Sequence, residues 1–117
     1  MIYLVDDDKS VRRGFELILR SAGFESISME SAEEFLSGFK PQKGNLLILD
    51  LTLPGMSGSD LLKKFEEVGI HIPVIVVSSY DEPQSRETCR KYGVKAFLRK
   101  PVDGEALIDL IKFNMGA

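Results

Sequence analysis

The chain has little of what several protein classes require. It contains one cysteine, Cys89, among its 117 residues. A lone cysteine cannot form an internal disulfide, so a disulfide-stapled secreted domain is excluded and a reducing, cytoplasmic location is expected. No apolar run approaches the roughly 18 residues of a membrane span, so we expect no membrane partner.

An excess of positive charge is also missing. The 15 basic and 18 acidic side chains give a formal net charge of −3 at pH 7. No overall basic field therefore attracts nucleic acid, and we expect no direct nucleic-acid binding. A chain of this length fits one compact domain. The sequence predicts a single domain over residues 1–117, with no second domain in this chain.

Five short apolar segments are the expected strands. Those at residues 2–5, 46–49 and 74–77 are apolar without alternation, which is typical of strands buried on both faces. Weaker strand patterns cover residues 25–29 and 96–98. Helical patterns lie between them, and this alternation predicts an α/β domain with a parallel sheet and right-handed crossovers.

The expected helices carry several local signals. Asp103 is the predicted N-cap of the last helix, and the segment Ser31-Ala32-Glu33-Glu34 matches a capping box. The segment at residues 83–92 is the weakest helix, because few of its residues are candidates for burial. The packing face predicted for the third helix, which ends at Gly69, comprises Leu61, Leu62, Phe65 and Val68.

Polar side chains follow four of the expected strands. These groups are Asp6-Asp7-Asp8, Asp50, Ser78-Ser79 and Arg99-Lys100-Pro101, in chain order. Ligands of open α/β sheets bind beyond the carboxyl ends of the strands, so we expect these groups to gather at one edge. For Asp8 we favour the simpler interpretation, a cap for the first helix.

Carboxylates gathered at such an edge repel one another unless a cation neutralises them. Oxygen ligands without imidazole or thiolate favour Mg²⁺ over zinc or copper, with Mn²⁺ as an acceptable substitute. A carboxylate beside Mg²⁺ and a lysine suits in-line attack on a phosphoryl group. The residues therefore indicate phosphoryl chemistry at this edge.

Four blocks, VDDDKSVRR, LLILDLTLPGMSG, PVIVVSS and AFLRKP, resemble in order and spacing the signature blocks of the receiver domain of two-component response regulators. The resemblance implies a single flavodoxin-like domain with strand order 2-1-3-4-5 and helices on both faces. It also implies a phosphorylation-activated switch, served by a sensor histidine kinase or phosphotransfer protein. The switch would alter the surface of the fourth helix, fifth strand and fifth helix to regulate an output domain or downstream protein.

The resemblance further implies roles for individual residues. Asp50 would be the phosphoacceptor, and Ser78 would hydrogen-bond a phosphoryl oxygen. Lys100 would pair with Asp50 and then with the phosphoryl group. Phe97 would be the switch aromatic that moves inward with Ser78, and the Lys100-Pro101 bond would be cis. The implied Mg²⁺ ligands are Asp6, Asp7, Asp50 and the backbone carbonyl of Thr52.

Some positions depart from the commonest pattern of that family. Ser78 stands where Thr is frequent, and Ser79 follows where Ala or Gly is usual. Phe97 replaces a frequent Tyr, so switching would depend on packing without a hydroxyl hydrogen bond. Thr52 and Tyr80 are expected to tune the lifetime of the phosphorylated form, with Tyr80 shielding it from water.

Two other functions share some of these features. A phosphatase of the haloacid-dehalogenase type also forms an aspartyl phosphate, but here Thr52 stands two positions after Asp50 and the strand is third, not first. A non-phosphorylated pseudo-receiver predicts losses among the five key positions, yet Asp6, Asp7, Asp50, Ser78 and Lys100 are all filled. We therefore expect a switch and not an enzyme, with at most Mg²⁺-dependent self-phosphorylation and autodephosphorylation.

Two further points concern partners. The lone histidine, His71, falls in a predicted turn, so we expect the chain to receive phosphate and not to pass it within itself. Charged residues on the fourth and fifth helices are compatible with a homodimer through the fourth helix, fifth strand and fifth helix. A charge set of this kind is usually a solvated face, so it does not by itself predict the dimer.

Overall fold

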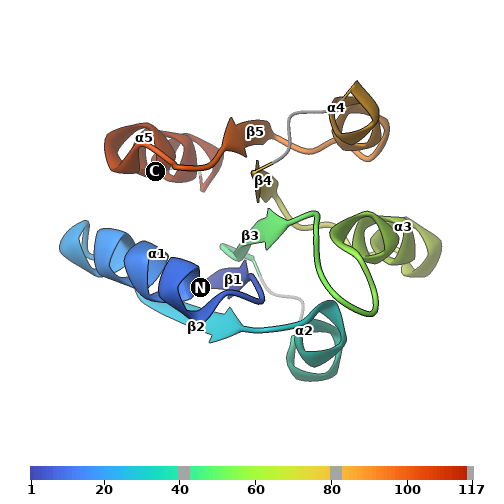
Figure 1. Ribbon diagram of the computed structural model, residues 1–117, viewed down its shortest axis with the longest axis horizontal. Coiled ribbons are helices and arrows are strands. Elements are labelled where there is room, and N and C mark those ends of the chain that lie inside the picture. Colours follow the sequence, from blue (N-terminus) through green and yellow to red (C-terminus); the bar gives the residue numbers. More distant parts are fainter. Residues whose placement is uncertain (40–42, 80–82, 116–117) are drawn as a thin grey trace.

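The computed structural model describes residues 1–39, 43–79 and 83–115, and within them strands alternate with helices along the chain (Figure 1). The strands are β1 (Ile2–Val5), β2 (Ser26–Met29), β3 (Leu46–Asp50), β4 (Val74–Ser78) and β5 (Ala96–Arg99). The helices are α1 (Lys9–Ser21), α2 (Ala32–Gly38), α3 (Gly58–Val68), α4 (Pro83–Lys91) and α5 (Gly104–Asn114). The predicted α/β alternation is confirmed.

The strands form one parallel sheet in the order β2-β1-β3-β4-β5. This is the order that the resemblance implied. Since all strands run the same way, their carboxyl ends meet at one edge, with β1, β3 and β4 side by side in the middle.

Helices cover both faces of the sheet, α1 and α5 on one face and α2, α3 and α4 on the other (Figure 1). Side chains alternate between the two faces along each strand. Leu47 and Leu49 therefore pack under α2 and α3, whereas Leu46 and Ile48 pack under α1 and α5. Every residue of β3 and β4 is buried, which explains why their sequences are continuous apolar runs.

Local capping signals were mostly correct. Asp8 and Asp103 are the N-caps of α1 and α5, as predicted. Ser31 accepts the backbone N–H of Glu34 at 3.0 Å, but the Glu34 carboxylate accepts the N–H of Glu30 and not that of Ser31. The predicted capping box is thus half formed, because the chain before α2 turns so that Glu30 presents its N–H to the carboxylate.

Two helix predictions had different outcomes. Val68 was wrongly placed on the packing face, since it is 53% exposed. It is the last residue of α3, directly before Gly69, whose φ of 75° ends the helix. The weak burial predicted for α4 is confirmed, because Cys89 is its only buried residue. Among the helices within the described residues, none has the length and apolar character that crossing a membrane requires.

Candidate functional site

Four polar residues lie where strands end at the carboxyl edge of the sheet. Asp6 follows β1, Asp50 and Ser78 end β3 and β4, and Lys100 follows β5. Asp6, Asp50 and Ser78 are among the buried polar residues, with exposed fractions of 0%, 6% and 1%. Burial of charged groups is costly unless they are paired or hydrogen-bonded, so the contacts they make determine what the site can do.

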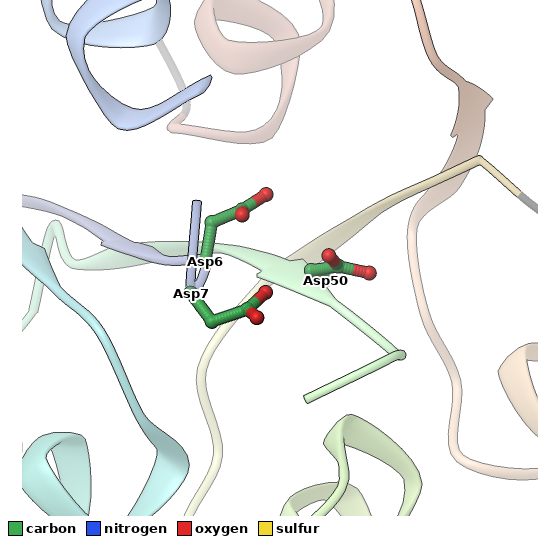
Figure 2. Close-up of side chains that lie close together, drawn as sticks. All are labelled: Asp6, Asp7 and Asp50. Atoms are coloured by element: carbon green, nitrogen blue, oxygen red, sulfur yellow. The ribbon is translucent and has the colours of Figure 1, made fainter. Parts of the chain in front are cut away.

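Two adjacent aspartates leave the end of β1 on opposite sides of the sheet. Asp6 is two residues beyond Leu4, which packs under α1 and α5, so its side chain points to that face of the sheet. Asp7 is two residues beyond Val5, which packs on the other face, so its side chain points there. Figure 2 shows their carboxylates pointing to these two sides, with Asp50 beside them. One oxygen from each of the three carboxylates lies within 4.8 Å of the others.

Lys100 binds two of these carboxylates. Its Nζ lies 2.6 Å from Oδ2 of Asp6 and 3.1 Å from Oδ2 of Asp50. The predicted pairing with Asp50 is confirmed, and so is the cis Lys100-Pro101 bond. The shorter contact to Asp6 was not predicted. Parity places Lys100 on the side of both aspartates, because Lys100 is two residues beyond Leu98, which packs under α1 and α5. Parity does not distinguish the two aspartates, so the shorter distance to Asp6 depends on the tertiary structure.

The second oxygen of each buried carboxylate accepts a backbone N–H from two residues ahead. Asp6 Oδ1 accepts the N–H of Asp8 at 2.9 Å, and Asp50 Oδ1 accepts that of Thr52 at 3.0 Å. In such a turn, a backbone N–H of the same segment fixes the orientation of the carboxylate. Asp7 is exposed, and within the described residues its carboxylate accepts no hydrogen bond. It is thus the carboxylate most open to an incoming cation.

Burial and charge act in opposite directions on the titration of the site. Burial raises the pKa of Asp50 above its ordinary value, although the N–H of Thr52 and the charge of Lys100 lower it. Burial alone would lower the pKa of Lys100, but its contacts with Asp6 and Asp50 outweigh that effect and raise the pKa. Lys100 is therefore held as a cation between carboxylates.

The chemistry of the site fits a divalent cation. With Asp6, Asp7, Asp50 and Lys100 ionised, the local charge is −3 + 1 = −2, from the carboxylates of the cluster and the ammonium that binds two of them. All the donors are carboxylate oxygens, which Mg²⁺ prefers. Burial raises the pKa of Asp50, and a bound cation would offset that effect by favouring the charged carboxylate.

The other predicted residues take different places around this cluster. Ser78 is two residues beyond Val76, so both side chains point to the α4 side of the sheet. Val76 pairs in register with Phe97 of β5, which lies on the same side. Phe97 is half-buried, and the Arg86 guanidinium of α4 lies 4.8 Å from its ring centroid. Thr52 is exposed directly after β3. Tyr80 lies outside the described residues, so its shielding role stays a prediction.

Two contacts near the site were not predicted. Arg12 of α1 donates from Nη1 to the backbone carbonyl of Asp6 at 2.7 Å, and Glu33 of α2 accepts the N–H of Met56 at 3.3 Å. Neither belongs to a local sequence pattern, since each depends on where a helix packs beside a loop. His71 is exposed in the loop before β4, as predicted.

Comparison with known sequences gives consistent relatives. A family model described as "Response regulator receiver domain" matches residues 2–112. The chain is 33% identical to nodulation protein W of Bradyrhizobium diazoefficiens, over 95% of this chain and 49% of that protein. It is 31% identical to the transcriptional regulatory protein FixJ of Azorhizobium caulinodans, over 98% of this chain and 54% of that protein. The chain thus spans about half the length of these curated relatives.

Solved structures of similar fold agree. The response regulator StyR superposes with a TM-score of 0.90 and 36% identity, covering 98% of this chain and 58% of that chain. The structure named FixJ-N gives a TM-score of 0.88 at 30% identity, covering 98% of this chain and 92% of that one. A receiver domain protein from Methanospirillum hungatei gives 0.86 at 28% identity, covering 98% and 92%.

Proposed function

The chain belongs to the response regulator receiver domain family, and from this premise we propose that it is a phosphorylation-activated signalling switch with Asp50 as phosphoacceptor. The observation that carries the proposal is the setting of Asp50. Its carboxylate ends the buried strand β3 and is bound on one oxygen by the Thr52 N–H and on the other by Lys100. Asp6 and Asp7 complete the acidic cluster.

The chemistry is transfer of a phosphoryl group to a carboxylate. An oxygen of Asp50 attacks the phosphorus and forms an O–P bond while the bond from phosphorus to the donor breaks. The donor's leaving atom, a histidine nitrogen or an acyl oxygen, takes the electron pair of that bond. Lys100 offers its ammonium to the negative oxygens of the phosphoryl group, and Ser78 offers a hydroxyl.

The proposed cation ligands are Asp6, Asp7, Asp50 and the backbone carbonyl of Thr52. Bound there, Mg²⁺ or Mn²⁺ supplies positive charge against the phosphoryl oxygens. The residues of the chain do the rest: the Asp8 and Thr52 N–H groups orient two of the carboxylates, and Lys100 holds them on one side of the sheet.

The proposed donor is a sensor histidine kinase or phosphotransfer protein, and the proposed receiver of the signal is an output domain or downstream protein. The relative FixJ is described as a transcriptional regulatory protein, and this chain covers only 54% of it. A change at Asp50 would reach the α4, β5 and α5 surface as Ser78 is drawn to the phosphoryl group and Phe97 moves with it. We propose a switch without catalytic turnover of other substrates.

Intact-mass measurement with Mg²⁺ and a small acyl phosphate tests the proposal. We expect one phosphoryl adduct on the wild type and on Asp109→Asn, a matched change of an exposed aspartate on α5. Asp50→Asn should carry none, and EDTA should prevent labelling of the wild type. Equal labelling of Asp50→Asn, or no adduct on the wild type, would overturn the proposal.

A further inference from the structure

The backbone carbonyl at the start of the acidic segment is held by a side chain. Strand β1 ends at Val5, and the N–H of Asp6 still bonds to the carbonyl of Met29 in the neighbouring strand, at 3.1 Å. The carbonyl of Asp6 instead accepts from Nη1 of Arg12, at 2.7 Å. Arg12 lies in the first half of α1, so this contact ties the helix to the end of the strand.

This contact controls the direction of the chain into Asp7. The carbonyl of Asp6 and the N–H of Asp7 belong to one planar peptide unit, so a donor that fixes the carbonyl fixes the whole plane. The carboxylate of Asp7 has no hydrogen bond of its own within the described residues. The position of that carboxylate therefore depends on the backbone of this segment, which Arg12 restrains at the Asp6 carbonyl and the Asp8 N–H restrains at Oδ1 of Asp6.

We infer that Arg12 is a positioning residue for the divalent-cation site, acting on the Asp6-Asp7 peptide and not on the cation. The inference rests on the proposed function, because it assumes that the acidic cluster binds Mg²⁺. The matched control residue is the adjacent Arg13, which is exposed. No hydrogen bond or ion pair of Arg13 occurs within the described residues.

Charge and position predict opposite results for the loss of Arg12. A guanidinium this close to the cluster repels a divalent cation, so electrostatics alone predicts tighter Mg²⁺ binding when the charge is removed. Loss of the peptide's orientation predicts weaker binding, because outer residues that orient metal ligands commonly contribute to metal affinity. The sign of the change separates these effects.

The experiment is a calorimetric Mg²⁺ titration of the full chain without phosphodonor. Arg12→Ala should weaken Mg²⁺ binding roughly 10-fold, the low end of the effect of losing a residue that orients metal ligands. Arg12→Lys keeps the charge and one donor, and should bind with intermediate affinity. Arg13→Ala should bind as the wild type does. The Mg²⁺ concentration that half-saturates the phosphorylation rate should rise in Arg12→Ala, while the rate at saturating Mg²⁺ stays near that of the wild type.

The outcomes separate the two proposals. A wild type that binds no Mg²⁺ overturns the metal part of the proposed function and this inference with it. A wild type that binds Mg²⁺, together with an Arg12→Ala that binds equally or more tightly, overturns the inference alone. If Arg12→Ala does not fold, Arg12→Gln replaces it: its amide is too short to hold the same carbonyl, so wild-type affinity in that variant would contradict the inference.

Discussion

Strand β3 and helix α4 differ sharply in how much of each is buried. All of β3, Leu46–Asp50, is buried between two layers of helices, whereas α4, Pro83–Lys91, buries only Cys89. The phosphoacceptor candidate Asp50 is the last residue of β3, and the switch candidate Phe97 contacts α4 through Arg86. The difference suggests a division of roles, with a rigid platform under the chemistry and a loosely held helix near the surface that would change.

Local stability accounts for this division in physical terms. Elements with many buried apolar contacts open only with the whole domain, whereas elements with few such contacts open at lower free energy. On the proposed function, a change at Asp50 would therefore meet little resistance at α4. The contrast between β3 and α4 therefore predicts large effects at the end of β3 and small ones at α4.

Truncating the core beneath Asp50 should be the most damaging change. Leu47 of β3 is fully buried, so Leu47→Ala should lower the free energy of unfolding by about 3 kcal/mol, from lost apolar burial and the cavity left behind. The matched control is Leu17→Ala, at a leucine that is 63% exposed, with an expected change below about 0.5 kcal/mol. Urea unfolding measures both, and equal effects would contradict the contrast.

Adding a methyl group against the end of β3 should be the next largest effect. A Cβ on Gly58 would lie 2.5 Å from the Asp50 carbonyl oxygen and 2.6 Å from Leu51 Cα. Because both are backbone atoms, Gly58→Ala should cost about 2 kcal/mol and slow phosphorylation of Asp50. In Gly14→Ala the new Cβ meets nothing within 4 Å, so that helix should gain about 0.5–1 kcal/mol. Destabilisation by Gly14→Ala of the same size would show that the clash is not the cause.

Removing the charge of Asp50 should have a smaller effect of the opposite sign. Burial raises the pKa of Asp50 in the folded protein. A carboxyl whose folded pKa is raised destabilises the fold as pH rises from its unfolded pKa through its folded pKa. Asp50→Asn should therefore be more stable than the wild type at neutral pH, and the difference should shrink on acidification below that window. Thermal unfolding of both proteins across pH checks this, and a difference that grows on acidification would contradict it.

The smallest effect is expected at α4. Removing the guanidinium over Phe97 in Arg86→Ala should cost about 0.5–1 kcal/mol, the strength of an exposed cation–π contact. Hydrogen exchange of α4 amides should then be roughly two- to fivefold faster, with β3 unchanged. Arg90→Ala, one turn along the same helix, is the control. Faster exchange throughout β3 would show that α4 is not a separate local unit.

The sequence predicted strands and helix caps correctly where neighbouring residues determine them. Continuous apolar runs gave β1, β3 and β4 to within a residue at either end, because burial on both faces favours apolar residues at consecutive positions. The weaker patterns gave β2 and β5 equally closely. Asp8 and Asp103 were correctly predicted as caps, since a cap bonds only to N–H groups two or three residues ahead. The prediction that Val68 lies on the packing face was wrong, because apolar spacing alone does not show which turn of a helix lies over the sheet.

Some features of the candidate site could likewise be predicted from the sequence, and others could not. That acids and a lysine gather at one edge followed from which residue ends each strand. The sequence did not predict that Lys100 binds Asp6, 94 positions away, more closely than it binds Asp50. The contact of Arg12 with the Asp6 carbonyl also escaped prediction, because it requires the first turns of α1 to fold back over the end of β1.

By itself the sequence determined the order of strands and helices, the polar groups at the strand ends and the face to which each strand side chain points. All of these follow from periodicity and neighbouring residues. Only the tertiary structure decided that Lys100 lies 2.6 Å from Asp6, that the Asp7 carboxylate stays open, and that Arg86 covers Phe97. Those distances depend on how the helices pack against a twisted sheet, and no local pattern encodes that packing.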